Sequence, residues 1–403
     1  MGDLATPEKI QKLQAALHAK AKGSPEYRFY SLYDKMYRKD VLEYAYACCR
    51  ANRGAAGVDA ERFEDIEAYG VERWLGELTD SLRNKTYQPQ ALRRAQIPKP
   101  NGKLRPLSIP TIRDRTAMRA ATLILAPIFE ADLPAEQHGY REERSALSAV
   151  QETRDLLVTG RTEVIDADLT DYFGSIPHAP LMKSVARRIA DRHVLHLIKM
   201  WLEAPVEESD DQGRTQRTTR SKDTHRGIPQ GSPISPLLSN LYMRRLVLGW
   251  KHRGYERRFD ARRVTYADDL GICCRNGAPE ALQGLRQIAG EIGLTINEDK
   301  TRVCQLPEGR FDFAGILLRT VLLRADRPIL YRTTAVAEEH SAYGGGDHYA
   351  NRTKDDLSGC RNDGAADQPA IAWVGELLSP RSRQQIIPGD QRSHRPEATS
   401  VVV

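Results

Sequence analysis

The stretch VTYADDLGIC, residues 264 to 273, places two aspartates side by side between two short runs rich in apolar and β-branched residues. Such runs around a short turn predict a β-hairpin with Asp268 and Asp269 at its tip. Adjacent carboxylates repel each other, and Asn-Gly or Asp-Gly would form a plain hairpin turn more favourably. A bound cation would offset the repulsion. Alternatively the pair is an ordinary polar turn, because a DD turn alone is weak evidence for a metal site.

A third carboxylate comes from RTEVIDADLTDYFGSIPH, residues 161 to 178. Alternate residues of a strand share a face, so Asp166 and Asp168 would lie on one face with Val164, while Ile165 and Ala167 face the other way. An unpaired carboxylate at the end of a partly buried strand would be costly. Asp168 would meet the aspartate pair if the two strands are neighbours in one antiparallel sheet.

Three clustered carboxylates would be stabilised by Mg²⁺, a hard cation that prefers oxygen ligands. Two such ions can activate a 3′-hydroxyl and stabilise a leaving pyrophosphate during in-line displacement. The spacing of the three aspartates therefore indicates phosphoryl-transfer chemistry, provided that the strands meet.

The bulk composition permits such chemistry without proving it. The chain has 403 residues, of which 40% are hydrophobic and 28% charged, and its formal charge is +6. This mild excess favours an anionic partner but is also common in ordinary enzymes. No stretch approaches the roughly 20 apolar residues of a membrane span, and the N-terminus lacks the apolar centre of a signal peptide, so we expect a cytoplasmic protein with no membrane partner. The six cysteines are expected to be reduced thiols.

Other segments have recognisable patterns. Residues from about 8 to 50 read as helical, as do residues 74–87, and a further helix is expected over residues 181–204. Pro-Asn-Gly at residues 100–102 predicts a tight turn between two extended segments that carry several lysines and arginines. This basic hairpin is either a solvated sheet edge or a flap that grips a polyphosphate. From about Tyr331 apolar periodicity is lost, and we expect a largely disordered tail beyond a boundary near Leu330.

The ordered series is more specific than any single motif. IPKPNGKLRPLSIP, DADLTDYFGSIPH, RGIPQGSPISPLLSNLYM, YADD, LTINEDKT and FDFAGILL follow one another over residues 97–318. Together with LYDKMYRKDVLEYAYACCRANRGAAGVD at residues 32–59, this series closely resembles the reverse transcriptases encoded by group II introns, over about residues 25–320. The resemblance implies an α+β right-hand polymerase, with fingers and a palm whose antiparallel sheet packs on helices.

The resemblance also implies a domain order. It predicts a helical N-terminal extension at 1–60, fingers at 61–160, a palm with the catalytic carboxylates and a primer grip at 161–330, and an atypical, disordered tail at 331–403. Members of this family normally continue into a helical thumb and a maturase region, and some add a nuclease. SPRSRQQIIPGDQRSHRPEATSVVV, at the end of this chain, resembles no thumb helix, as a truncated or frame-shifted reading frame would produce.

Site residues carry over by position. The resemblance assigns Asp168, Asp268 and Asp269 as metal ligands and Lys300 as a catalytic lysine near the triphosphate. Contacts to the incoming nucleotide or template are assigned to Lys99, Arg105, Phe173, Gln230 and Gly231, and the primer grip to Phe313 and Gly315. Each of these motifs taken alone also has a structural interpretation. Lys300 would form a salt bridge, PQGSP would form a turn, and FDFAG would belong to the core.

Phe173 indicates whether the enzyme makes DNA or RNA. It lies five residues beyond Asp168, where this family has an aromatic side chain under the incoming sugar. A ring at that position leaves no room for a 2′-hydroxyl, so dNTPs are favoured. Alternatively, Phe173 is simply a core residue.

The resemblance therefore implies an RNA-directed DNA polymerase that adds dNTPs to a DNA primer on an RNA template with two Mg²⁺ ions, in intron mobility and with intron RNA as a partner. One alternative is a non-catalytic, maturase-like protein that binds intron RNA, against which the three intact aspartates argue. Another is a truncated, inactive remnant, which the missing thumb favours.

Overall fold

The helices in the N-terminal third of the protein pack around one long buried helix. The structure, a computed structural model, describes residues 4–98, 104–209, 214–307, 309–314, 316–321 and 330–335. These residues belong to a single unit, Met1–Cys360. Lys99, Gly315 and residues 336–403 lie outside them, so the predicted roles of Lys99 and Gly315 and most of the predicted tail fall outside the described residues.

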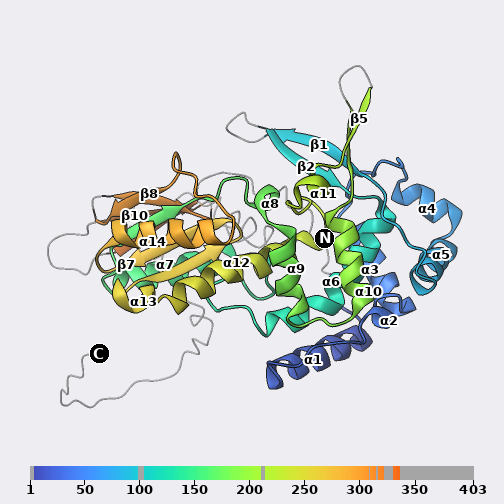
Figure 1. The fold of residues 1–403 in the computed structure, drawn as a ribbon, viewed down its shortest axis with the longest axis horizontal. Helices are drawn as coiled ribbons and strands as arrows, with labels where there is room; N and C mark the ends of the chain where they lie inside the picture. The colour runs from blue at the N-terminus through green and yellow to red at the C-terminus, as the bar shows by residue number, and fades with distance from the viewer. Residues whose placement is uncertain are drawn as a thin grey trace, which may run out of the picture. The chain divides into compact units, whose positions relative to one another are not determined.

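The segment predicted as helical over residues 8–50 consists of three helices. The described helices up to residue 130 are α1 (Glu8–Gly23), α2 (Tyr33–Met36), α3 (Lys39–Ala51), α4 (Phe63–Tyr69), α5 (Val71–Arg83) and α6 (Ile112–Glu130). Ser24 and Pro25 follow α1, and proline cannot continue a helix. Helices α1 and α3 both pack on α6, which is buried over most of its length (Figure 1).

A small sheet contains the predicted basic hairpin. Its strands are β1 (Leu92–Pro98), β2 (Leu104–Ile109), β4 (Val206–Ser209) and β5 (Thr215–Thr218), in the order β2-β1-β4-β5. The antiparallel pairing of β1 with β2 confirms the hairpin. Strand β4 comes from more than a hundred residues further along the chain and pairs with β1 in parallel, at Leu92 and Val206. Local sequence patterns do not predict such a long-range pairing.

The central sheet brings the two aspartate segments together. Its strands are β3 (Glu163–Ala167), β6 (Arg262–Tyr266), β7 (Asp269–Cys274) and β8 (Arg302–Gln305), in the order β6-β7-β3-β8. Strand β3 is antiparallel to both β7 and β8, as the convergence of the carboxylates requires. Ile165 and Ala167 belong to the main core, whereas Val164 packs in a second core with Val264 and Phe313. The alternation predicted for this strand is therefore confirmed.

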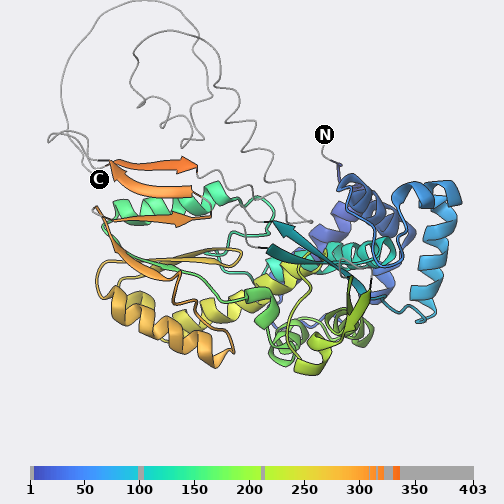
Figure 2. The same ribbon diagram turned by 90° about the horizontal axis from the view of Figure 1, so that it is seen from above.

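Helices cover both faces of the central sheet. Helix α7 (Ala146–Val158) packs with the second core, and α12 (Ser235–His252) and α14 (Ala278–Glu291) pack with the main core. Figure 2 shows the central sheet between α14, drawn in light orange, and α7, drawn in green. The short helices are α8 (Tyr172–Ser175), α11 (Arg220–Thr224) and α13 (Tyr255–Arg258). This mixture of helices and mainly antiparallel sheets is the predicted fold class.

The single helix predicted over residues 181–204 is two helices, α9 (His178–Ala186) and α10 (Arg192–Leu202). Asp191 interrupts the pattern, because its carboxylate caps α10 by accepting from His193 N at 3.0 Å. The same carboxylate accepts from Leu32 N and Tyr33 N, each at 2.9 Å. The break therefore joins this region to the N-terminal helices.

The last described strands form a third sheet, in the order β11-β10-β9. They are β9 (Arg310–Phe313), β10 (Ile316–Val321) and β11 (Leu330–Ala335). Strand β11 contains the first five residues of the segment expected to be disordered, and it pairs with β10 along its length. The predicted boundary near Leu330 therefore falls at the start of a paired strand.

Two smaller expectations can be compared with the described residues. Cys48, Cys49, Cys273, Cys274 and Cys304 are all free thiols, as expected. No helix in the described ranges combines the length and apolar character needed to cross a bilayer.

Candidate active site

The Asp268 hairpin depends on tertiary contacts for its turn. Tyr266 pairs with Asp269, so Ala267 and Asp268 form a two-residue turn. Ala267 has φ +56°, a conformation in which glycine or asparagine is preferred. The backbone of Gly139 lies against this turn, so closely that a Cβ on Gly139 would be 2.2 Å from Ala267 N. Asn240 Nδ2 fixes this segment by donating to the Gly139 carbonyl at 2.7 Å.

Gly139→Ala is expected to destabilise the fold by about 1–3 kcal/mol, because the added methyl group must displace the turn backbone rather than a flexible side chain. Urea unfolding measures the free-energy change. Gly290→Ala in α14 is the matched control, since a Cβ there meets nothing within 4 Å. Equal stabilities of Gly139→Ala and the wild type would show that the contact does not hold the turn.

Burial and neighbouring carboxylates raise the pKa values of Asp268 and Asp269. Register pairs Ala167 with Leu270, which places Asp168 beside Asp269 across the sheet. Burial raises the pKa of Asp268, and the charge of Asp168 raises it further. Burial, followed by the charges of Asp268 and Asp168, raises the pKa of Asp269 to about 8. The site therefore disfavours a third negative charge unless a cation is close.

Two predicted basic residues lie in this environment. Lys300 Nζ lies 3.1 and 3.3 Å from the two carboxylate oxygens of Asp168. Arg105 in β2 and Lys300 both favour the charged form of Asp268 and so oppose the rise of its pKa. The structure therefore brings a residue of the basic hairpin and the lysine of LTINEDKT to the same carboxylates.

The donor chemistry suits a hard divalent cation, since all three acidic side chains offer oxygen ligands. In the described part of the chain, however, no three His, Cys, Asp or Glu side chains are arranged around a common metal position. Lys300 instead neutralises Asp168, which also accepts from Asn297 Nδ2 at 3.0 Å. Binding of one cation by all three aspartates thus requires these side chains to shift.

Asp269→Asn is expected to stabilise the metal-free protein at pH 8, by up to about 5 kcal/mol. The folded pKa is raised to about 8, so stability is highest below pH 4 and is lost as the pH rises towards 8. The amide carries no charge and avoids this loss. In EDTA, the melting temperature of Asp269→Asn should exceed that of the wild type by an amount that grows from pH 5 to pH 8. The exposed control Asp155→Asn should melt with the wild type across this range. A difference in melting temperature that does not change with pH would contradict the raised pKa of Asp269.

Phe173 lies next to the PQGSP segment. Its side chain is 7% exposed and packs edge-to-face on Tyr172, with ring centroids 5.7 Å apart. Its carbonyl accepts from Ile228 N at 2.8 Å. The Gln230 carbonyl accepts from Ser108 N at 2.7 Å, so the segment joins α8 to β2. Gly231 has φ +106°, which favours glycine.

Phe313 is a core residue by its packing. It is 1% exposed, and its ring would lie 3.2 Å from a Cβ on Gly271 in β7. Its side chain therefore supports the sheet, and any contact with a primer would have to come from the backbone.

The sequence patterns did not single out Asn297, Thr301 or Gly139. Thr301 Oγ1 accepts from the backbone N–H of Asp168 at 3.2 Å. Asn297 and Lys300 are three residues apart in one turn, and this spacing was a usable signal for a shared contact. Gly139 gave no local signal, because its role depends on a distant turn.

Comparison with known proteins agrees with this geometry. Residues 97–326 match the family described as reverse transcriptase (RNA-dependent DNA polymerase). Protein YkfC of Escherichia coli (strain K12) is 31% identical over 345 residues, covering 76% of this chain and 87% of that protein.

Group II intron proteins are also similar. Group II intron-encoded protein LtrA of Lactococcus lactis subsp. cremoris is 32% identical over 54% of this chain and 35% of its own length. A putative COX1/OXI3 intron 1 protein of Saccharomyces cerevisiae is 32% identical over 44% of this chain and 20% of its own length. The chain thus spans about a third or less of these two longer relatives.

The fold and the matched region define an RNA-directed DNA polymerase, a nucleotidyltransferase that uses an RNA template and a primer. The chain belongs to the reverse transcriptase family and is of the group II intron type. Members of this family generally use a divalent metal ion.

Proposed function

We propose that Asp168, Asp268 and Asp269 bind two Mg²⁺ ions for DNA synthesis on an RNA template. The observation that carries this proposal is the antiparallel pairing of β3 with β7, which brings Asp168 next to Asp269 and the turn residue Asp268, where burial and neighbouring charge raise the pKa of both Asp268 and Asp269. Bound Mg²⁺ would supply activation of the primer 3′-hydroxyl and charge stabilisation at the leaving pyrophosphate.

The basic residues have complementary roles. Lys300 neutralises Asp168 without metal, and in the loaded site its ammonium group is positioned to favour departure of the negatively charged pyrophosphate. Arg105 approaches from β2 and would hold the triphosphate, together with Lys99 of the same hairpin. These contacts would align the α-phosphate with the primer terminus.

Phe173, Gln230 and Gly231 would form the side of the pocket that holds the nucleotide and template. The aromatic ring of Phe173 would lie under the sugar of the incoming nucleotide and exclude a 2′-hydroxyl. The hydrogen bond from Ile228 N to the Phe173 carbonyl supports this grouping, because it ties the backbone of Phe173 to the residue that precedes PQGSP. Phe313 and Gly315 would act as a primer grip through their backbone.

The RNA partner is proposed to be intron RNA, in intron mobility. Support comes from the similarity to LtrA, which is named as a group II intron-encoded protein. A filter-binding comparison of the intron RNA with an unrelated RNA of equal length tests this partner. Tighter binding of the intron RNA is expected, and equal affinities would contradict it.

Extension of oligo(dT) on poly(rA) with dTTP tests the polymerase site and its metal. Incorporation should require a divalent cation, should stop in EDTA and should be restored by Mg²⁺. Activity that Mn²⁺ restores but Mg²⁺ does not would contradict the choice of Mg²⁺, whereas incorporation in EDTA would contradict the metal mechanism altogether.

A further inference from the structure

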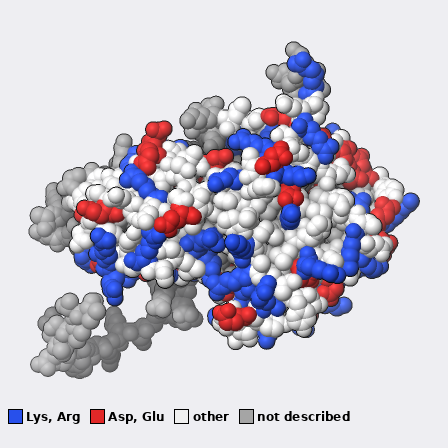
Figure 3. All heavy atoms as spheres, in the orientation of Figure 1, with Lys and Arg blue, Asp and Glu red and all other residues white. Residues whose placement is uncertain are grey.

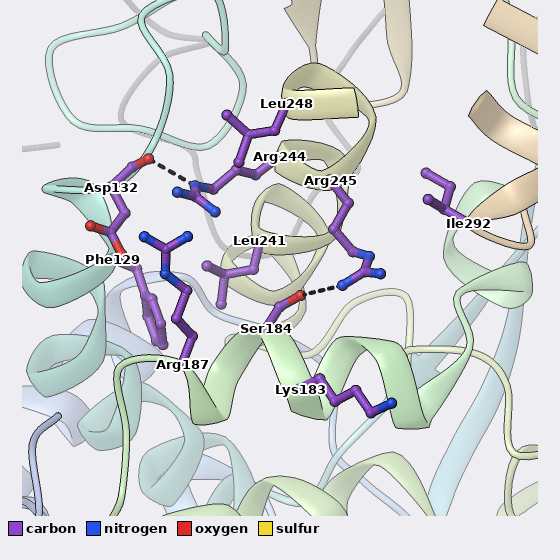
Figure 4. Close-up of a pocket in the computed structure, with 10 residues that line it drawn as sticks. All are labelled: Phe129, Asp132, Lys183, Ser184, Arg187, Leu241, Arg244, Arg245, Leu248 and Ile292. Atoms are coloured by element: carbon purple, nitrogen blue, oxygen red, sulfur yellow. Dashed lines mark hydrogen bonds between the residues drawn. The ribbon is translucent and has the colours of Figure 1, made fainter. Parts of the chain in front are cut away.

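A cavity elsewhere in the molecule contains none of the proposed active-site residues. It has a volume of about 330 Å³ and lies between α9, α12 and the end of α6 (Figure 4). Its walls carry the apolar side chains of Phe129, Leu241 and Leu248 beside a group of four basic residues, Lys183, Arg187, Arg244 and Arg245. Pockets of roughly 300–1,000 Å³ accommodate small organic ligands.

The four basic residues lack acidic partners among the described residues. Arg244 Nε donates to the backbone carbonyl of Asp132 at 2.9 Å, and Arg245 Nη1 to Ser184 Oγ at 3.4 Å. The carboxylate of Asp132, the one acidic side chain in the lining, lies 3.4 Å from Arg188 Nε instead. Arg245 Nε is buried without a hydrogen-bond partner. The charge of Asp132 favours the charged form of Arg244, but Asp132 forms its ion pair with Arg188, so the lining, with four basic residues and one acidic residue, keeps an excess of positive charge.

This arrangement has an energetic cost. Lys183 lies in α9 and Arg187 is its C-cap residue, four positions further on, a spacing at which like charges repel. Burial, and then the charge of Arg187, lowers the pKa of Arg244. Figure 3 shows Lys and Arg side chains gathered below the centre of the visible face, in the region of α9 and α12. An anion in the pocket would relieve the repulsion.

We propose that this pocket binds one nucleotide unit of a single RNA strand, outside the polymerase site. Arginine guanidinium groups match the geometry of a phosphate, and the apolar side chains in the lining can contact a ribose or base. Figure 4 shows the guanidinium groups of Arg187 and Arg244 on the same side of the pocket as Asp132, above Phe129. The pocket would thus hold RNA whether or not metal and dNTP are bound, and the proposal does not rest on the metal ligands.

The test compares wild type with Lys183→Gln/Arg187→Gln, which changes two exposed positions, one in α9 and one at its C-cap. Binding of a fluorescein-labelled 20-nucleotide RNA is measured by anisotropy in EDTA without primer, over a series of salt concentrations. The variant should bind about tenfold more weakly near 0.1 M salt, and its log–log salt slope should be shallower by about 1.4. Arg257→Gln/Arg258→Gln on α13 loses the same charge at exposed positions and should bind as the wild type does.

The charge-conserving exchange Lys183→Arg/Arg187→Lys should bind the RNA with most of the wild-type affinity. Weak binding by the glutamine variant would then reflect the lost positive charges and not a disturbed fold. Unchanged RNA affinity in the glutamine variant would overturn the proposal, and so would an equal loss in the α13 control. Inorganic tripolyphosphate is titrated in parallel. If it binds the wild type but not the glutamine variant while both bind RNA equally, the pocket serves a free polyphosphate and the RNA proposal is wrong.

Discussion

Asp268→Asn is expected to lower primer extension on poly(rA)/oligo(dT) about a thousandfold or more. The substitution removes one anionic oxygen ligand from the proposed metal site, and metal-ion stabilisation of the transition state contributes several kcal/mol, where about 4 kcal/mol corresponds to a thousandfold in rate. The amide keeps the size of the side chain. It also removes the charge that helps raise the pKa of Asp269, so the metal-free fold should be at least as stable as that of the wild type.

Asp155→Asn in α7 is the control for the loss of one acid, because Asp155 is exposed and is not one of the proposed ligands. Single-turnover extension measures the rate, and melting in EDTA confirms the fold. Extension by Asp268→Asn at the rate of the Asp155→Asn control would exclude Asp268 as a metal ligand.

Phe173→Val is expected to reduce the preference for dNTPs over rNTPs about tenfold or more, a change typical of resizing an apolar contact with substrate. Shrinking the ring opens space for a 2′-hydroxyl without removing any proposed metal ligand. Since Phe173 is buried against Tyr172, the variant should also lose stability, as other large-to-small core changes do. Use of dNTPs should be partly retained.

Tyr172→Phe separates the gate from the core. Tyr172 donates to the Ser239 carbonyl at 2.7 Å, so its loss weakens the same region without changing the size of the Phe173 ring. The ratio of kcat/KM for dTTP and UTP is measured for both variants. If Phe173→Val and Tyr172→Phe shift this ratio equally, Phe173 is a core residue and not a gate.

Much of the polymerase site could be predicted because its signals are local. Alternation along β3 and the paired runs around Asp268 indicate strands by themselves, and their antiparallel pairing was the condition under which the carboxylates meet. The ordered motifs then indicated the family. Arg105 and Lys300 were expected near the phosphates, and the structure places both where they affect the charge of Asp268.

Features that depend on distant parts of the chain could not be predicted in this way. Asp191 divides an otherwise continuous helical pattern because it also bonds to Leu32 and Tyr33, far away in the sequence. The tight contact of Gly139 with Ala267 and the parallel pairing of β1 with β4 are likewise tertiary. The ion pair of Lys300 with Asp168 combines two predicted residues in an arrangement that the patterns left open.

Direct binding of a divalent cation is the measurement that bears most closely on the metal site. Mn²⁺, whose free ion is detected by electron paramagnetic resonance, is titrated into the wild type and into Asp268→Asn/Asp269→Asn without nucleotide or primer. We expect the wild type to bind Mn²⁺ that Mg²⁺ displaces, and the double variant to bind at least tenfold more weakly. Equal Mn²⁺ binding by the two proteins would contradict the assignment of these aspartates as metal ligands.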